Sequence, residues 1–309
     1  MKIKKLDAYN RIPKEGVSNE YVTGPNSFRS PFLACVIGAR TSGKSFLTSQ
    51  ILLQAELENT YDEIFYIGPT FNSNKKYFER FIPLKNVYEP TKCSIGSVMK
   101  RVDENRDEYL RHIEDVEEWK RYKEKIRSRP IRSFGTSELL YYLEKGFLDD
   151  QPPEWKYPIL RPPTSLLILD DVINTKAISQ SSGFSQLSVL NRHASPMPED
   201  HDDRSALGLA VIILAQSYCC LGGIPRICRE NVSLLFLFKN KQEKQMEKIK
   251  DELANVVDID KFEKAYSYAT AEEYGNLCVD FKPKNPELTF RKNLNEAIVF
   301  DCENKVINI

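Results

Sequence analysis

Short apolar runs recur along the chain, and each ends in glycine or in a polar side chain. The strongest lie at 32–37, 64–67, 165–169, 208–215 and 232–238. Runs of this length without alternation are typical of strands buried on both faces of a parallel sheet. Helix-forming segments separate several of them, and a strand, helix, strand order implies right-handed crossovers. The pattern therefore predicts an α/β fold with a parallel-sheet core sandwiched by helices.

Residues 72–160 interrupt this alternation and are predicted to be a largely helical insertion. A polar helical tract runs over about 97–128, a second helix over about 136–145, and a proline-rich linker leads back to the sheet. The long tract is acidic first and basic at its end, which suits the helix dipole and favours a solvated, self-stabilising helix. The alternative is a nucleic-acid surface, because Trp119 and Tyr122 interleave with the basic residues.

The clearest chemical motif follows the first apolar run. Gly38 and Gly43 are separated by four residues, and Lys44 and Ser45 come next, which fits the P-loop pattern. Glycines let backbone amides approach an anion, the helix that starts at Lys44 directs its positive end toward it, and the ammonium and hydroxyl suit phosphates and Mg²⁺. An ordinary surface turn is the alternative, which the strand, loop, helix context disfavours. The predicted nucleotide-binding residues are Gly38, Ala39, Arg40, Thr41, Ser42, Gly43, Lys44, Ser45 and Phe46.

Two carboxylates end the run at 165–169, in the manner of a Walker B strand. Ligands collect at the carboxyl ends of parallel strands, so Asp170 is predicted to lie beside the P-loop and to hold Mg²⁺ with Ser45. Asp171 is placed to orient or deprotonate an attacking water, although many ATPases carry Glu at this position. An Asp pair that caps the following helix is the alternative interpretation.

Polar residues after two later runs are further candidates. Gln216 ends the run at 208–215 and is predicted either to position water near a γ-phosphate or to make an ordinary strand-end hydrogen bond. Arg226 and Arg229 precede the next strand, where they supply an arginine finger to a neighbouring subunit or pair with local acids such as Glu230. Arg192 and the histidine after it form an Arg-His pair, and such a pair is usually just an exposed part of the protein surface.

Three segments are predicted: an N-terminal surface arm at 1–31, a P-loop domain at 32–274, and a C-terminal tail or edge strands at 275–309. Proline and glycine among charged residues indicate the arm. The aromatic residues near the end of the domain have near-helical spacing and are predicted to be core: Phe262, Tyr266, Tyr268 and Tyr274.

Composition narrows the possible partners and compartment. Lys and Arg total 44 and are balanced by 44 Asp and Glu, so any basic surface is local. The seven cysteines are scattered and are read as reduced thiols. The N-terminus lacks the apolar region of a signal peptide, and no apolar stretch is long enough to span a membrane.

The motifs taken together resemble those of the poxvirus-type viral genome-packaging ATPases of the FtsK/HerA superfamily. The resemblance covers roughly residues 30–260 without the insertion, and it rests on GARTSGKS, IFYIGPTFN, LLILDD, the Arg-His pair at 192–193, VIILAQ, and IPRICREN before LLFLFKNK. It implies an additional-strand P-loop ATPase core of the RecA/FtsK/HerA-like type. It also implies catalytic roles for Lys44, Asp171 and Gln216, metal binding by Ser45 and Asp170, and a finger acting in trans at Arg192 or Arg229.

The same resemblance implies a function. The expected protein is an ATP- and Mg²⁺-dependent motor that works as a homo-oligomeric ring, a hexamer or pentamer, and drives double-stranded DNA into a capsid at a portal or vertex protein. Its expected location is the host cytoplasm at the assembly site, or the virion. The alternatives are a plasmid or conjugative DNA pump of the same superfamily, a nucleotide-binding switch or scaffold, and a small-molecule kinase.

Overall fold

A computed structural model describes residues 2–5, 20–175, 178, 182–198, 206–219, 223–240 and 242–300 of the chain. It divides into two compact units, the first comprising residues 1–102 and 164–309 and the second residues 103–163. The second unit begins at Asp103, later than the predicted start of the insertion at residue 72. The residues between these positions include a helix and a strand that belong to the first unit.

A ten-stranded sheet forms the centre of the first unit, in the order β1-β12-β11-β10-β9-β2-β8-β5-β3-β4. The apolar runs of the sequence form its middle strands, which are buried along their whole length or nearly so. The strand bounds are β1 Lys2–Lys5, β2 Leu33–Ile37, β3 Glu63–Ile67, β4 Val87–Tyr88, β5 Ser165–Asp170, β8 Leu209–Ala215, β9 Leu234–Phe238, β10 Asn276–Asp280, β11 Phe290–Lys292 and β12 Glu296–Val299. β6 (Ser195–Pro196) and β7 (Ala206–Leu207) pair separately.

The strand order confirms the predicted fold class. The block β9-β2-β8-β5-β3-β4 is parallel throughout. β8 lies between the strand that leads into the P-loop and the strand that ends in Asp170, which is the arrangement of an additional-strand P-loop core. Ile37 is opposite Ala215, and Asp170 is opposite Leu214, so the carboxyl ends of β2, β8 and β5 meet at one edge.

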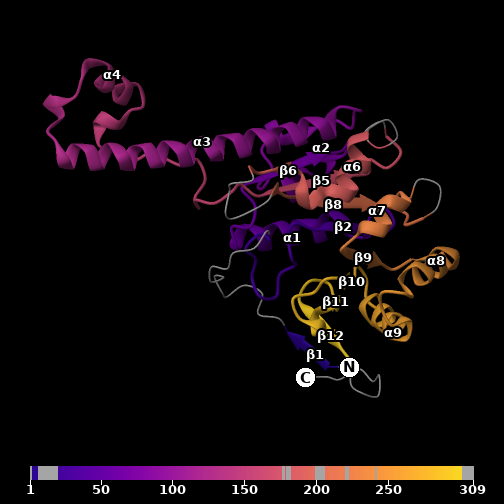
Figure 1. Ribbon diagram of the computed structural model, residues 1–309. Helices are drawn as coiled ribbons and strands as arrows, with labels where there is room; N and C mark the ends of the chain where they lie inside the picture. Colours follow the sequence, from indigo (N-terminus) through magenta and orange to yellow (C-terminus); the bar gives the residue numbers. More distant parts are fainter. Residues whose placement is uncertain are drawn as a thin grey trace. The chain divides into compact units, whose positions relative to one another are not determined.

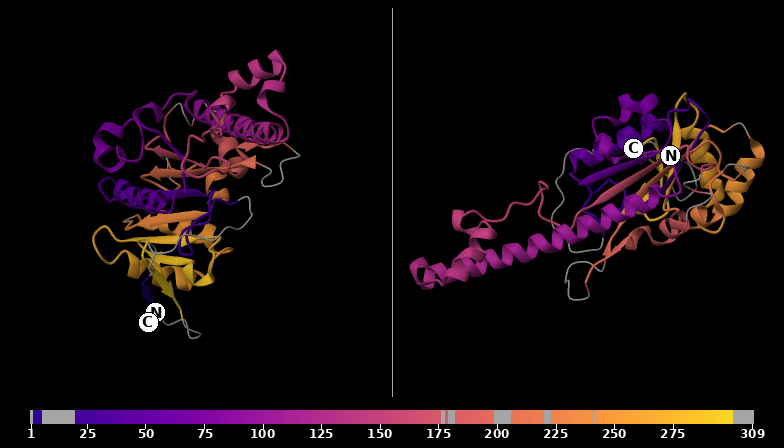
Figure 2. Two further views of the ribbon diagram at one scale, coloured as in Figure 1. Left: turned by 90° about the vertical axis from the view of Figure 1, so that its left-hand side faces the viewer. Right: turned by 90° about the horizontal axis from the view of Figure 1, so that it is seen from above.

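Helices cover both faces of this sheet. α1 (Lys44–Leu57) and α2 (Phe71–Phe78) pack on one face, where Leu47, Ile51 and Phe78 join strand residues in a continuous apolar core. α6 (Ser182–Leu190) lies on the other side of the strands (Figures 1 and 2) and packs against α7 (Arg226–Asn231). α8 (Glu243–Leu253) and α9 (Ile259–Ala269) follow β9 in the chain.

An antiparallel extension continues the sheet beyond β9. β10 pairs antiparallel with β9, and β11, β12 and β1 follow in the same sense. Residues 276–299, predicted as a tail or edge strands, therefore form three strands of the main sheet. Residues 301–309 lie outside the described part of the chain. Residues 2–5 form the outermost strand, so segments from the two ends of the chain are neighbours.

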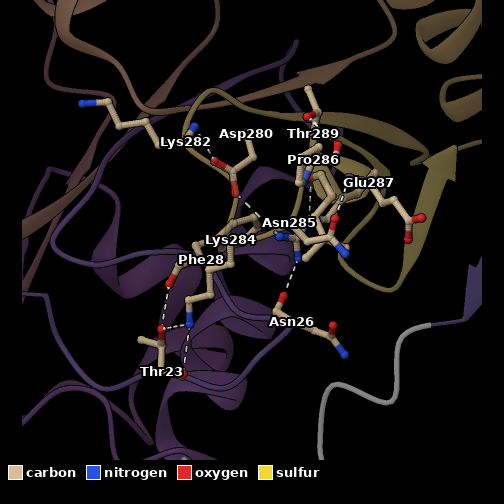
Figure 3. Close-up of polar contacts among 12 residues, drawn as sticks. Thr23, Asn26, Phe28, Asp280, Lys282, Lys284, Asn285, Pro286, Glu287 and Thr289 are labelled. Carbon is tan, nitrogen blue, oxygen red and sulfur yellow. Dashed lines mark hydrogen bonds and ion pairs between the residues drawn. The ribbon is translucent and has the colours of Figure 1, made fainter. Parts of the chain in front are cut away.

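The segment from residue 20 to residue 31 differs from the predicted surface arm. Tyr21 and Phe28 are buried, and Phe28 belongs to the main core. The antiparallel extension holds this segment (Figure 3), because Lys284 Nζ donates to the carbonyl oxygens of Thr23 at 2.9 Å and Gly24 at 2.7 Å. Arg291 Nη1 donates to the Asn26 carbonyl oxygen at 2.6 Å, and its guanidinium lies 4.4 Å from the Phe28 ring centroid. Residues 6–19 of the predicted arm lie outside the described residues.

The second unit is helical and has a small aromatic core of its own. It contains the part of α3 (Ser94–Ser128) from residue 103 onward, together with α4 (Thr136–Glu144). Tyr122, Phe134, Tyr142 and Phe147 are buried together, and ion pairs such as Lys125 with Glu138 join the two helices. Tyr122 is thus a core residue, which favours the predicted self-stabilising helix over a stacking surface for nucleic acid.

Candidate functional site

A wide cleft opens at the sheet edge where the middle parallel strands end. Its volume is about 1170 Å³. The P-loop, the ends of β5 and β8, helix α2 and the segments 272–276 and 293–295 of the antiparallel extension all contribute lining residues. Lys44, Asp170, Asp171 and Gln216 come from separate parts of the sequence and are brought together here.

The P-loop has the backbone that an anion cradle needs. Gly38 donates its N–H to the Ala215 carbonyl oxygen at 3.1 Å, which ties the loop to the end of β8. A Cβ on Gly38 would lie 2.3 Å from Ser42 Oγ and 3.0 Å from the Phe238 side chain, so a side chain at this position would require both neighbours to shift. Gly43 has φ of 103° immediately before α1. Ser42 Oγ is buried without a hydrogen-bond partner in the described structure.

Lys44 occupies the centre of this loop. Its Nζ donates to the carbonyl oxygens of Gly38 at 2.7 Å and Ala39 at 2.9 Å. Burial lowers the pKa of Lys44 from its ordinary value, while the nearby carboxylates of Asp170 and Asp171 act in the opposite direction. The ammonium is held by neutral carbonyl oxygens, so a phosphate can displace them and gain a charge-assisted bond.

Asp170 is fixed by three donors, one from β3, one from the turn after it and one from α2. Its Oδ2 accepts hydrogen bonds from Tyr66 Oη at 2.6 Å, Thr70 Oγ1 at 2.8 Å and Asn74 Nδ2 at 3.0 Å. Burial and the Asp170 carboxylate both raise the pKa of Tyr66, so its phenol remains a donor at neutral pH. The carboxylate is therefore buried, oriented and charge-stabilised before any ligand arrives.

Asp171 and Gln216 are paired across the strand ends. Gln216 Nε2 donates to Asp171 Oδ1 at 3.2 Å, and both side chains are exposed to the cleft. Asp171 has φ of 54°, a left-handed conformation that turns the chain sharply after β5. An exposed carboxylate with an amide beside it can accept a proton from water while the amide orients the same water.

The cleft also contains a donor set that fits Mg²⁺. The Ser45 hydroxyl and the Asp170 carboxylate both line it, and hard oxygen ligands with space for water and phosphate oxygens are what Mg²⁺ prefers.

Arg192 lies away from this cleft. It belongs to a short 3₁₀ turn after α6 and is exposed. The pKa of Lys282 is lowered mainly by burial and also by the positive charge of Arg192, so the two side chains are near one another. Lys282 follows β10, whose last residue, Asp280, is opposite Leu234 at the start of β9. The P-loop lies at the other end of the parallel strands, so Lys282 and Arg192 are at the sheet edge opposite the P-loop.

Arg229 is engaged within its own chain. Its Nε and Nη2 each donate to a carboxylate oxygen of Glu252 at 3.0 Å, and its guanidinium lies 5.4 Å from the Tyr218 ring centroid. The side chain is only 12 % exposed, which suits a structural ion pair between α7 and α8. Arg226 is 83 % exposed and pairs with Glu230, as one sequence alternative predicted for this loop.

Several lining residues were not predicted from the sequence. Tyr66 in β3, Thr70 in the turn after it and Asn74 in α2 reach Asp170, and none of the three was assigned a role from the sequence alone. Tyr274 was predicted to be core, but it is 61 % exposed and lines the cleft. Its φ of 63° places it in a tight turn after α9, which removes it from the helical spacing that suggested burial.

The chain was compared with known proteins. No protein-family model matches it, and no curated protein matches it in sequence. No described helix is long and apolar enough to cross a membrane.

Three solved structures illustrate what the fold is similar to. The genome packaging NTPase B204 from Sulfolobus turreted icosahedral virus 2, in complex with ATP-gammaS, has a TM-score of 0.40 and 14% identity over 85% of this chain and 98% of that chain. EssC (ATPases 2 and 3) from Geobacillus thermodenitrificans has a TM-score of 0.36 and 17% identity over 70% and 34%. The pCW3 conjugation coupling protein TcpA has a TM-score of 0.40 and 14% identity over 80% and 60%.

Proposed function

We propose that this chain is an ATP-hydrolysing motor that translocates double-stranded DNA during viral genome packaging. The observation that supports hydrolysis is the meeting of Lys44, the Asp170–Asp171 pair and Gln216 in one cleft at the carboxyl edge of an additional-strand sheet. The DNA-translocating part rests on the resemblance of this motif series to the packaging ATPases.

Each side chain has a role in this proposal. The P-loop amides and Lys44 bind the β- and γ-phosphates, and Ser45 and Asp170 hold Mg²⁺. The metal, when bound, neutralises charge that develops on the phosphate oxygens. Asp171 accepts a proton from the attacking water, and Gln216, hydrogen-bonded to Asp171, orients that water toward the γ-phosphorus. The products are ADP and inorganic phosphate.

The assembly in this proposal is a homo-oligomeric ring, a hexamer or pentamer, docked on a portal or vertex protein of the capsid. The expected site of action is the host cytoplasm or the virion. Arg192, exposed and remote from its own cleft, is the candidate finger for the neighbouring subunit, since Arg229 would have to leave its ion pair with Glu252. Lysines and arginines that face the pore would contact DNA phosphates without reading sequence.

The test is steady-state ATP hydrolysis with Mg²⁺, with and without double-stranded DNA. We expect DNA to raise turnover, and we expect Lys44→Ala to lower kcat/KM at least about a hundredfold because phosphate stabilisation is lost. Asp171→Asn should retain ATP binding and lose about 10²–10⁴ in kcat. Lys75 is an exposed lysine on α2 that pairs with Glu79 and does not line the cleft, so Lys75→Ala is the matched control and should leave turnover unchanged.

Two results would contradict the proposal. One is an assembled wild-type chain that binds ATP and never turns it over, which would favour a switch or scaffold. The other is transfer of the γ-phosphate to a metabolite without any response to DNA, which would favour a kinase.

A further inference from the structure

Of the six residues other than glycine that have positive φ in the described part of the chain, four line the cleft. These four are Thr41 at 63°, Asp171 at 54°, Tyr274 at 63° and Asn293 at 54°. Left-handed backbone is costly for residues with a Cβ and tends to persist where function requires it. Thr41 and Asp171 belong to the P-loop and the Walker B turn. Tyr274 and Asn293 come from the antiparallel extension, and the proposed hydrolysis gives them no role.

Tyr274 is an aromatic surface set beside the phosphate loop. A Cβ built on Gly43 would lie 3.6 Å from Tyr274 Cδ1, so the ring reaches the start of α1. The ring is 61 % exposed, and its hydroxyl is hydrogen-bonded to Glu273, which restricts its orientation. Gly275 has no room for a side chain, since a Cβ there would lie 2.4 Å from the Ala269 carbonyl oxygen. The turn that presents the ring is therefore closely packed.

The charges around Tyr274 differ from those around the P-loop. Arg40, Lys44 and Lys76 line the cleft as cations, whereas Glu272 and Glu273 directly precede Tyr274 and repel phosphate. Glu272 is itself paired with Lys292 at 3.1 Å, and Asn276 and Asn293 are joined by a 3.0 Å hydrogen bond. Asn276 is buried and lines the cleft, and its Oδ1 has no partner in the described structure. This wall suits an uncharged, flat group with polar edges.

We propose that residues 272–276 and 293–295 form the nucleobase wall of the cleft, with the Tyr274 ring stacked on the base of bound ATP. This inference rests on the proposed function, which supplies the nucleotide. The Tyr274 ring lies beside Gly43 of the P-loop, so it offers a large π-face within reach of a base whose phosphates are bound there. The amide groups of Asn276, Asn293 and Asn295 are the polar groups available to the base and ribose. The antiparallel extension thereby determines base affinity while the parallel block performs the chemistry.

The experiment compares two probes, MgATP and magnesium tripolyphosphate, by calorimetric titration. Tripolyphosphate carries the phosphate chain without the base. We expect Tyr274→Ala to weaken MgATP binding about tenfold or more and to leave tripolyphosphate binding within twofold, because base stacking alone is lost. Tyr274→Phe keeps the ring and should stay within about threefold for both probes. Tyr141→Ala removes an exposed tyrosine of the second unit and is the matched control.

A folding defect is separated from a binding defect by Tyr274→Gly. Glycine accepts positive φ, so this variant should unfold at the same temperature as wild type or higher, yet bind MgATP as poorly as Tyr274→Ala. Equal loss of both probes in Tyr274→Ala, or no loss of MgATP binding, would overturn the nucleobase wall while leaving the proposed ATPase intact. A wild-type chain that binds neither probe would overturn both proposals.

Discussion

At the scale of single residues, the Asp170 carboxylate is closely constrained in the cleft. Three donors hold one of its oxygens, and the shortest of these bonds comes from Tyr66 at 2.6 Å. A carboxylate that is fixed before the metal arrives loses less freedom on binding it. Tyr66 is thus a positioning residue for the proposed metal site.

We therefore predict that Tyr66→Phe raises the Mg²⁺ concentration needed for half-maximal ATP hydrolysis by about 10–100-fold, the usual cost of losing such a supporting bond. Turnover at saturating Mg²⁺ should fall much less. The measurement is turnover against Mg²⁺ concentration at fixed ATP. Tyr61→Phe is the matched control, because Tyr61 Oη also has a buried partner, Ser30 Oγ at 2.9 Å, and lies outside the cleft lining. An unchanged Mg²⁺ requirement in Tyr66→Phe would contradict the prediction.

The sequence motifs identified the proposed catalytic and metal-binding residues, but they did not identify the residues that hydrogen-bond to them and hold them in place. Lys44, Asp170 and Gln216 could be named because each follows an apolar run at a spacing that chemistry dictates. Tyr66 could not, since a tyrosine inside a strand is equally consistent with an ordinary core. Tyr274 was misplaced because the near-helical spacing was extended past Ala269, where α9 ends, into a turn in which Tyr274 itself has a left-handed backbone.

At the scale of elements, the antiparallel extension binds the segment from residue 20 to residue 31 onto the core. Lys284 donates to two carbonyl oxygens of this segment, and burial lowers the pKa of its ammonium. Hydrogen bonds from a charged group are worth about 1.5–3 kcal/mol each, partly offset by the desolvation of the ammonium.

We predict that Lys284→Met lowers the thermal unfolding midpoint by about 2–6 °C, because the methionine fills the space but leaves the Thr23 and Gly24 carbonyl oxygens without their donor. Limited proteolysis should cut within residues 20–31 sooner than in wild type. Lys282→Met is the control, since Lys282 lies near Arg192 and its ammonium is repelled by it. The prediction fails if both variants unfold alike.

The parallel strands could be predicted because their burial on both faces leaves an unbroken apolar run. The antiparallel extension was predicted only as a tail or edge strands, because short strands such as β11 contain too few residues to show an alternation of apolar and polar positions. Residues 20–31 were predicted as a surface arm from their proline and glycine content. These residues indicate turns, but the groups that cover Phe28, such as the Phe236 ring and the Arg291 guanidinium, are far away in the sequence.

At the scale of the whole molecule, the proposed ring requires each cleft to be completed by a neighbouring copy. In the described structure, the cleft of one chain includes Arg40 but neither Arg192 nor Arg229. An arginine finger in trans is worth about 10³–10⁵ in turnover.

We predict that Arg192→Ala abolishes most ATP hydrolysis and that mixing it with inactive Lys44→Ala restores part of the activity. In a mixed ring, the intact P-loop of one variant meets the intact Arg192 of the other. The measurement is turnover of the mixture at increasing ratios, and Arg121→Ala, an exposed arginine of the second unit, is the control. A mixture no more active than its components would exclude Arg192 as the shared residue.

The three hydrogen bonds to Asp170 also bear on which cation the cleft selects. With Oδ2 occupied by Tyr66, Thr70 and Asn74, the carboxylate has only Oδ1 to offer a metal. Calcium commonly takes both oxygens of a carboxylate in large, irregular shells, whereas magnesium takes single oxygens in a compact octahedron. If Asp170 holds the metal as proposed, we therefore expect the hydroxyl, the amide and the phenol that occupy its Oδ2 to favour magnesium over calcium.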